Sequence, residues 1–148
     1  MIREANIEDI SAINEIGLRI NTNYASIYNL LDVLNQKYSK IYVYEDANII
    51  KGFLHIENHY EITDIINIAV LKCFENNKIA SQMLDYLFKT SAADKIMLEV
   101  RADNQRALGL YQKKGFKEIH RRPNYYTDTD AIIMERSIYH VRCNYLGN

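Results

Sequence analysis

Apolar and polar positions follow a helical rhythm in four stretches of the chain. Near the N-terminus, Ile10, Ile13 and Ile16 recur at helical spacing behind Asn6, a residue suited to begin a helix. Glu8 and Asp9 then place acidic groups in the first turn, where the helix dipole favours them. The same spacing of apolar residues predicts three further helices, over residues 23–37, 79–90 and 104–114.

Between these stretches lie short runs rich in β-branched and aromatic residues. Asp46-Ala47-Asn48 separates two of them, which predicts a hairpin. Strands are predicted over residues 2–4, 41–45, 49–57, 62–70, 95–101, 116–122 and 131–138. The order β-α-α-β-β-β-α-β-α-β-β indicates a mixed α/β sandwich with a strand–loop–helix crossover at its centre. Residues 1–148 are expected to form a single domain.

Composition narrows the class of protein. The 148 residues are 48% hydrophobic and 25% charged, with a net charge of −1, which is typical of a soluble globular domain and gives no reason to expect nucleic-acid binding. No apolar run could span a membrane, and no signal peptide is evident, so a cytoplasmic location is expected. Cys73 and Cys143 are interpreted as free thiols. His55 and His59 lack a third ligand, so no metal site is expected.

The loop over residues 71–78 connects a predicted central strand to a predicted helix. Free backbone N–H groups and the helix dipole converge at such a junction, which makes it a potential phosphate site. The alternative is a plain strand-to-helix connection, and the absence of glycine from the loop favours that alternative.

Several sequence words after residue 62 occur together in a fixed order. They are INIAV (66–70), MLEVR (97–101), N-x-x-A-x-x-L-Y (104–111), GF (115–116), RRPNYY (121–126) and DAIIM (130–134). With these words the chain resembles the GNAT superfamily of acetyl-CoA-dependent N-acetyltransferases. It is most similar to the RimI-type branch, whose members acetylate the N-terminal alanine of a ribosomal protein. The resemblance covers residues 62–138, and the N-terminal third shares only the order of elements.

The resemblance implies an α/β (α+β) fold with a mixed, mostly antiparallel sheet flanked by helices. It also implies acetyl-CoA as cosubstrate, with no metal. Glu99 corresponds to the family's general base and Tyr111 to its general acid. The residues implied to contact the coenzyme are Ile68, Ala69 and Val70 for the pantetheine arm, Asn76, Asn77, Lys78, Ile79, Ala80 and Ser81 for the pyrophosphate, and Asn104, Ala107 and Tyr111 beside the rest of the arm.

The residue types suit this reaction. An α-amine has a pKa of about 7.7–8.0, so a carboxylate, acting through a water molecule, can remove its proton before attack on a thioester. A phenol can return a proton to the leaving thiolate. Two structural alternatives remain: Glu99 as a solvated carboxylate at the rim of the sheet, and Tyr111 as a core aromatic on its helix face.

Aromatic residues indicate where an acceptor would bind. Tyr125 and Tyr126 lie between the last two predicted strands, in the loop that lines the peptide slot of RimI-like enzymes. Aromatic rings suit that role because they are rigid and carry a polar tip. Tyr24 and Tyr28 could border the slot from the opposite side. The alternatives are a solvated basic turn for the first pair and core packing for at least one of the second.

One stretch departs from the family pattern. The pyrophosphate loop usually reads Q/R-x-x-G-x-G/A, whereas residues 75–80 here are Glu-Asn-Asn-Lys-Ile-Ala. Lys78 replaces a glycine, and Asn76 or Glu75 replaces the customary basic residue, which predicts weaker binding of acetyl-CoA. Asn77 tolerates left-handed backbone, and the Lys78 ammonium could reach a phosphate, so both could compensate.

Three functions therefore remain open. The first is RimI-like transfer of acetyl to a protein N-terminal α-amine, by direct attack in a ternary complex. The second is acetylation of a small amine. The third is a non-catalytic GNAT domain that binds a partner. A monomer or homodimer is expected, with no membrane or nucleic-acid partner, and residues 139–148 could pack against a neighbouring copy.

Overall fold

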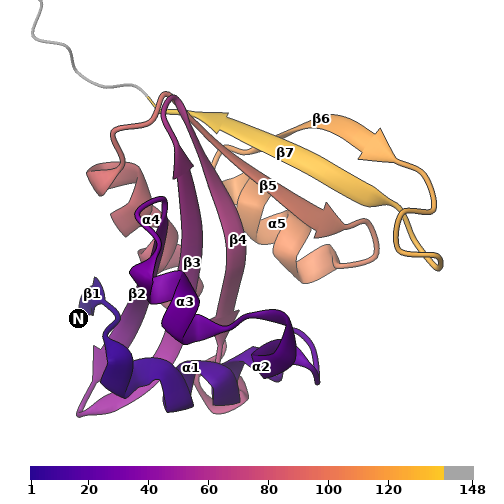
Figure 1. The fold of residues 1–148 in the computed structure, drawn as a ribbon. Helices are drawn as coiled ribbons and strands as arrows, with labels where there is room; N and C mark the ends of the chain where they lie inside the picture. Colours follow the sequence, from indigo (N-terminus) through magenta and orange to yellow (C-terminus); the bar gives the residue numbers. More distant parts are fainter. Residues whose placement is uncertain (139–148) are drawn as a thin grey trace, which may run out of the picture.

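A computed structural model describes residues 1–138 and shows one seven-stranded sheet with helices on both faces (Figure 1). The strand order is β1-β2-β3-β4-β5-β7-β6, and every neighbouring pair is antiparallel except β4 and β5. The strands are β1 (Ile2–Glu4), β2 (Ser39–Asp46), β3 (Ile49–His59), β4 (Ile62–Val70), β5 (Lys95–Arg101), β6 (Lys117–Arg122) and β7 (Ala131–Ser137). The α-helices are α1 (Ile10–Gly17), α2 (Tyr24–Ile27), α3 (Leu30–Asn35), α4 (Ile79–Thr90) and α5 (Gln105–Lys113), with short 3-10 helices η1 (Ile7–Asp9) and η2 (Lys72–Phe74).

The mixed, mostly antiparallel sheet with flanking helices confirms the fold class expected from the sequence. Local signals act as predicted at several element ends. The side chain of Asn6 accepts from Glu8 N–H in a capping box with Asp9. Ala47 and Asn48 both have positive φ, 51° and 64°, as a two-residue hairpin turn requires. Within the described residues, no helix is long and apolar enough to cross a membrane.

The single helix predicted over residues 23–37 is wrong, because the stretch forms two short helices. Tyr28 and Asn29 have extended backbone between α2 and α3. The Asn29 side chain accepts a hydrogen bond from Asp32 N–H at 3.2 Å and so begins α3. Asparagine favours such a capping position over a helix interior, which overrides the continuous apolar stripe.

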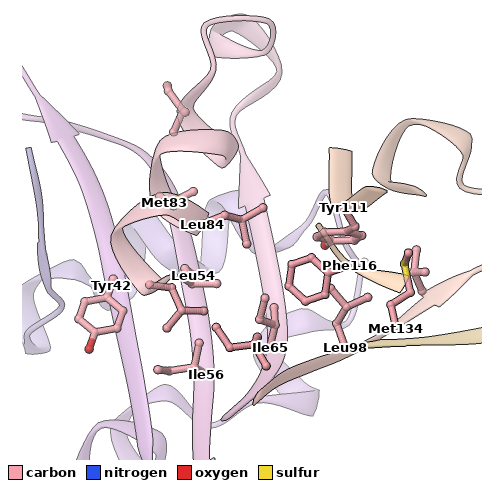
Figure 2. Close-up of a cluster of buried hydrophobic side chains, with 14 of the residues drawn as sticks. Tyr42, Leu54, Ile56, Ile65, Met83, Leu84, Leu98, Tyr111, Phe116 and Met134 are labelled. Atoms are coloured by element: carbon pink, nitrogen blue, oxygen red, sulfur yellow. The ribbon is translucent and has the colours of Figure 1, made fainter. Parts of the chain in front are cut away.

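Each face of the sheet carries its own core. On one face, α1, α2 and α3 cover β2 and β3, with Ile13, Tyr24 and Phe53 completely buried. On the other face, α4 and α5 pack on β3, β4, β5 and β7, and the cluster contains Leu54, Leu98 and Tyr111 (Figure 2). The outermost strand, β6, has every residue exposed.

The central strands β4 and β5 pair only over a short distance. Ile62–Ile65 are aligned with Lys95–Leu98, and beyond these residues the two strands diverge (Figure 1). Ile66 is the extra residue of a bulge, because His55 aligns with Asn67 whereas Ile56 aligns with Ile65. A bulge bends its strand and raises the local twist. The β5–β7–β6 half of the sheet consequently turns away from β4.

The α1–α2 packing depends on Gly17. A Cβ atom at this position would lie 2.2 Å from Cδ1 of Tyr24, whose ring is completely buried. We therefore expect Gly17→Ala to destabilise the protein by about 1–3 kcal/mol through overpacking. Thermal and urea unfolding measure the loss. Gly109→Ala is the matched control, because a Cβ there meets nothing within 4 Å, and it should stabilise α5 by about 0.5–1 kcal/mol. Equal stability of the two variants would contradict this account.

Candidate active site

A cleft of about 260 Å³ lies where β4 and β5 diverge. Side chains alternate across β5, and Ile96, Leu98 and Val100 are buried in the core beneath α4 and α5. Glu99 therefore projects from the opposite face, and it is one of the residues that line the cleft. The full lining is Asp64, Ile65, Ile66, Met97, Leu98, Glu99 and Ile133.

Tyr126 makes the shortest polar contact in this cleft. Its hydroxyl donates a hydrogen bond of 2.7 Å to Oε1 of Glu99. Arg122 Nη1 lies 3.9 Å from the other carboxylate oxygen. Burial and the hydrogen bond to Glu99 both raise the pKa of the Tyr126 phenol, so it keeps its proton and remains a donor. The loop after β6 is thereby joined directly to the predicted base.

Charged contacts hold that loop in place. Arg101, two residues beyond Glu99 on β5, pairs with Asp128 at 2.8 Å, and its guanidinium lies 5.1 Å from the centre of the Tyr126 ring. The Asp130 carboxylate accepts from Asn124 N–H at 2.9 Å. The Tyr125 ring meets that of Tyr126 edge-on, with centroids 5.0 Å apart. Tyr125 is about half exposed, so it presents an aromatic surface beside the cleft.

Tyr111 approaches from the other face of the sheet. It lies on α5 and packs edge-on against Phe116, with ring centroids 5.6 Å apart (Figure 2). Only 7% of the residue is exposed, and burial raises the pKa of its phenol to about 12. The hydroxyl therefore carries its proton at neutral pH. The structure thus puts Glu99 at the cleft on one face of the sheet and Tyr111 in the core on the other face.

The loop before α4 adopts left-handed backbone at two positions. Asn76 has φ 68° and Lys78 has φ 59°, so the expectation that Asn77 would take this conformation is wrong. Asparagine accepts it readily, whereas a lysine pays an energetic cost. Lys78 is the N-cap of α4 but makes no side-chain capping bond. The predicted loop residues Ile79, Ala80 and Ser81 form the first turn of the helix.

Glu75 joins this loop to two distant helices. Its carboxylate accepts hydrogen bonds from Arg19, just beyond α1, and from Arg106 on α5, the latter at 2.7 Å. Arg106 also donates to Asn76 Oδ1 at 3.1 Å. Sequence reasoning missed both arginines. The only indication in the sequence that either arginine contacts this loop is the positive charge of Arg106 near the start of a predicted helix.

The remaining residues predicted to contact the coenzyme lie at the end of β4 and at the start of α5. Ile68, Ala69 and Val70 pair with β3 but lie beyond the last residue pair of β4 with β5. Asn104 begins α5, its side chain accepting from Ala107 N–H at 3.1 Å. Asn104 and Ala107 therefore lie at the same end of α5 as Arg106.

The two N-terminal tyrosines have different environments. Tyr24 is completely buried against Gly17 and Phe53, which corrects its assignment as a substrate contact to one of core packing. Tyr28 is half-buried, and its ring meets His55 edge-on with centroids 5.8 Å apart. In residues 1–138, no group of three or more His, Cys, Asp or Glu side chains is arranged to hold a metal ion. The suggested packing role of residues 139–148 lies outside the described residues.

Comparison with known proteins identifies the family. Residues 37–118, more than half of the chain, match the model of the acetyltransferase (GNAT) domain. The chain belongs to the GNAT acetyltransferase family, as the resemblance of its C-terminal half predicted.

Individual relatives agree with this assignment. A Bacillus subtilis (strain 168) protein, provisionally named a [ribosomal protein bS18]-alanine N-acetyltransferase, is 30% identical over 90% of this chain and 92% of its own length. The crystal structure of the ribosomal-protein-S18-alanine N-acetyltransferase from Escherichia coli has a TM-score of 0.84, with 26% identity over 97% of both chains. An aminoglycoside 6'-N-acetyltransferase complexed with coenzyme A shares the fold, with a TM-score of 0.83 over 95% of this chain and 98% of that one, at 17% identity.

The Tyr126–Glu99 hydrogen bond gives a direct test of the loop's role. Tyr126→Phe removes the donor to Glu99 while keeping the ring, so we expect kcat for acetyl transfer to fall about tenfold, the worth of a hydrogen bond to a charged group. Steady-state assays with a peptide acceptor measure the change. Tyr125→Phe is the control, since its ring keeps the edge-on contact and Glu99 keeps its donor. Equal losses in both variants would show that the hydrogen bond has no special role.

Proposed function

We propose that this GNAT acetyltransferase transfers an acetyl group from acetyl-CoA to the N-terminal α-amine of a protein. The observation that carries the proposal is the hydrogen bond from Tyr126 to Glu99 at the cleft between β4 and β5. This hydrogen bond links the aromatic loop to Glu99. The aromatic rings are suited to contact a peptide, and the carboxylate is suited to accept a proton.

The gap between β4 and β5 fits the coenzyme. Past Ile65, the edge of β4 that faces β5 forms no ladder pairs with it, so the backbone of Ile68–Val70 can take an extended ligand as an added strand. The gap leads to the start of α4, where N–H groups without a side-chain cap favour an anion. Pantetheine and pyrophosphate would occupy these two regions in turn.

Acetyl-CoA supplies the acetyl group as a thioester. Glu99 accepts a proton from the acceptor ammonium through a water molecule, which frees the nitrogen lone pair for attack on the carbonyl carbon. As the C–S bond breaks, Tyr111 donates its phenolic proton to the sulfur; the attacking nitrogen releases its second proton to solvent, and the phenolate of Tyr111 regains a proton from solvent. Burial raises the pKa of the Tyr111 phenol, so the phenol holds the proton that it would donate.

The acceptor is proposed to be a polypeptide N-terminus, as in the name of the Bacillus subtilis relative. Tyr125 and Tyr126 would contact the backbone of the first residues, while Ile66, Met97 and Ile133 offer a small apolar surface beside Glu99. Such a lining suits a short first side chain such as alanine. Tyr28 borders this side of the sheet through its contact with His55.

Substitution of the two proposed catalytic residues tests the chemistry. We expect Glu99→Gln and Tyr111→Phe each to lower kcat by about 10²-fold or more, because each removes one proton transfer. Circular dichroism and melting curves establish that both variants are folded. Near-normal turnover in both would remove Glu99 and Tyr111 from the mechanism.

Acceptor class is tested with a matched panel. We expect a peptide that begins with alanine to be acetylated at least tenfold faster than the same peptide carrying an N-terminal block and an internal lysine. The α-amine titrates at about 7.7–8.0 and lysine at about 10.4, so far more of the α-amine is neutral at pH 7.5. Mass spectrometry locates the acetyl group. Faster acetylation of small amines than of either peptide would favour the small-amine function instead.

A further inference from the structure

The phosphate loop carries a negative charge at the point where an anion is expected to bind. Glu75 lies three residues before Lys78, the residue that begins α4. Its side chain is 21% exposed and is shared between Arg19 and Arg106. The hydrogen bond from Arg106, and after it the charges of Arg106, Arg19 and Lys72, lower the pKa of the Glu75 carboxyl, so it is ionised at neutral pH.

The two arginines come from opposite sides of the loop. Arg19 follows the end of α1, whereas Arg106 lies in the first turn of α5. Arg106 engages Glu75 through Nη1 and Asn76 through Nη2, and its side chain is still 62% exposed. Two guanidinium groups and one carboxylate leave a net charge of +1 on these three side chains. A single arginine would suffice to neutralise Glu75, so the second is in excess.

A pyrophosphate is a stronger partner for these groups than one carboxylate. Guanidinium forks match phosphate oxygens in bidentate geometry, and a pyrophosphate offers more oxygens and more negative charge. The existing ion pairs lie at the surface and are partly exposed, and such pairs contribute little, so exchanging them costs little. Screening by salt weakens them further.

We propose that Glu75 is an internal anion which occupies Arg19 and Arg106 until the pyrophosphate of the coenzyme displaces it. The two arginines then replace the basic residue that the loop itself lacks, and Arg106 keeps Asn76 in its left-handed conformation. This inference rests on the coenzyme of the proposed function but not on its acceptor or its catalytic residues.

The test is a calorimetric titration of the full chain with CoA and with dephospho-CoA, which lacks the 3′-phosphate but retains the pyrophosphate. We expect Glu75→Gln to tighten binding of both ligands about three- to tenfold, because the competing anion is gone. Arg106→Gln should weaken binding of both about tenfold, the loss of a charge-assisted hydrogen bond. Pantetheine, which has no phosphate, should bind wild type and both variants equally.

Matched controls and a double variant distinguish displacement of Glu75 from a nonspecific effect of protein charge on coenzyme binding. Glu15→Gln and Lys113→Gln make the same charge changes on exposed parts of α1 and α5 and should alter each Kd less than twofold. In the Glu75→Gln/Arg106→Gln protein, the gain from removing Glu75 should be clearly smaller than in Glu75→Gln alone, because competition then remains only for Arg19. An undiminished gain would mean simple repulsion between Glu75 and the ligand, and would overturn the proposal.

Other outcomes also decide the matter. Unchanged or weaker binding by Glu75→Gln, or an Arg106 effect confined to CoA, would overturn the displacement model. If wild type and Glu75→Gln both bind CoA as expected but neither acetylates any acceptor, the proposed function fails and this inference stands. If neither folded protein binds CoA at millimolar concentration, both fail together.

Discussion

The separation of β4 from β5 is the constraint on which the rest of the molecule depends. Four residue pairs hold the two strands together, and the bulge at Ile66 then directs them apart. Backbone groups at the edge of a strand need partners, and leaving them without a neighbouring strand carries a cost that water or a ligand must offset. An unpaired strand edge in the middle of a sheet is unusual. Here the unpaired edge of β4 beyond Ile65 forms part of the candidate active site.

The gap also divides the chemistry between the two faces of the sheet. On one face, Glu99 lies in a solvated cleft with Tyr126 and Arg122 close by. On the other, Tyr111 lies in a nearly dry core, where burial keeps its phenol protonated. The carboxylate of Glu99 is thus placed to accept a proton on one face, and the phenol of Tyr111 keeps a proton to donate on the other.

Much of this arrangement follows from the sequence: runs of β-branched and aromatic residues place all seven strands, and the spacing of apolar residues places α4. Glu99 and Tyr111 could be singled out because they stand in words with fixed spacing. The helix break at Tyr28 and Asn29 was missed because a local capping bond overrode a continuous apolar stripe. The contacts of Glu75 were missed for a different reason: they join residues 56 and 31 positions apart, and only the tertiary fold brings these side chains together.

The exposed strand β6 and the loop that follows it have a consequence for how such a protein can change over evolutionary time. The proposed acceptor contacts, Tyr125 and Tyr126, lie in the loop that follows this strand, which has no buried residue, and surface ion pairs such as Arg101–Asp128 tie the loop to β5. The core and the coenzyme gap lie elsewhere. Mutations in this strand and loop can therefore accumulate with little loss of stability, so lineages that share this fold are free to diverge in the acceptors they modify.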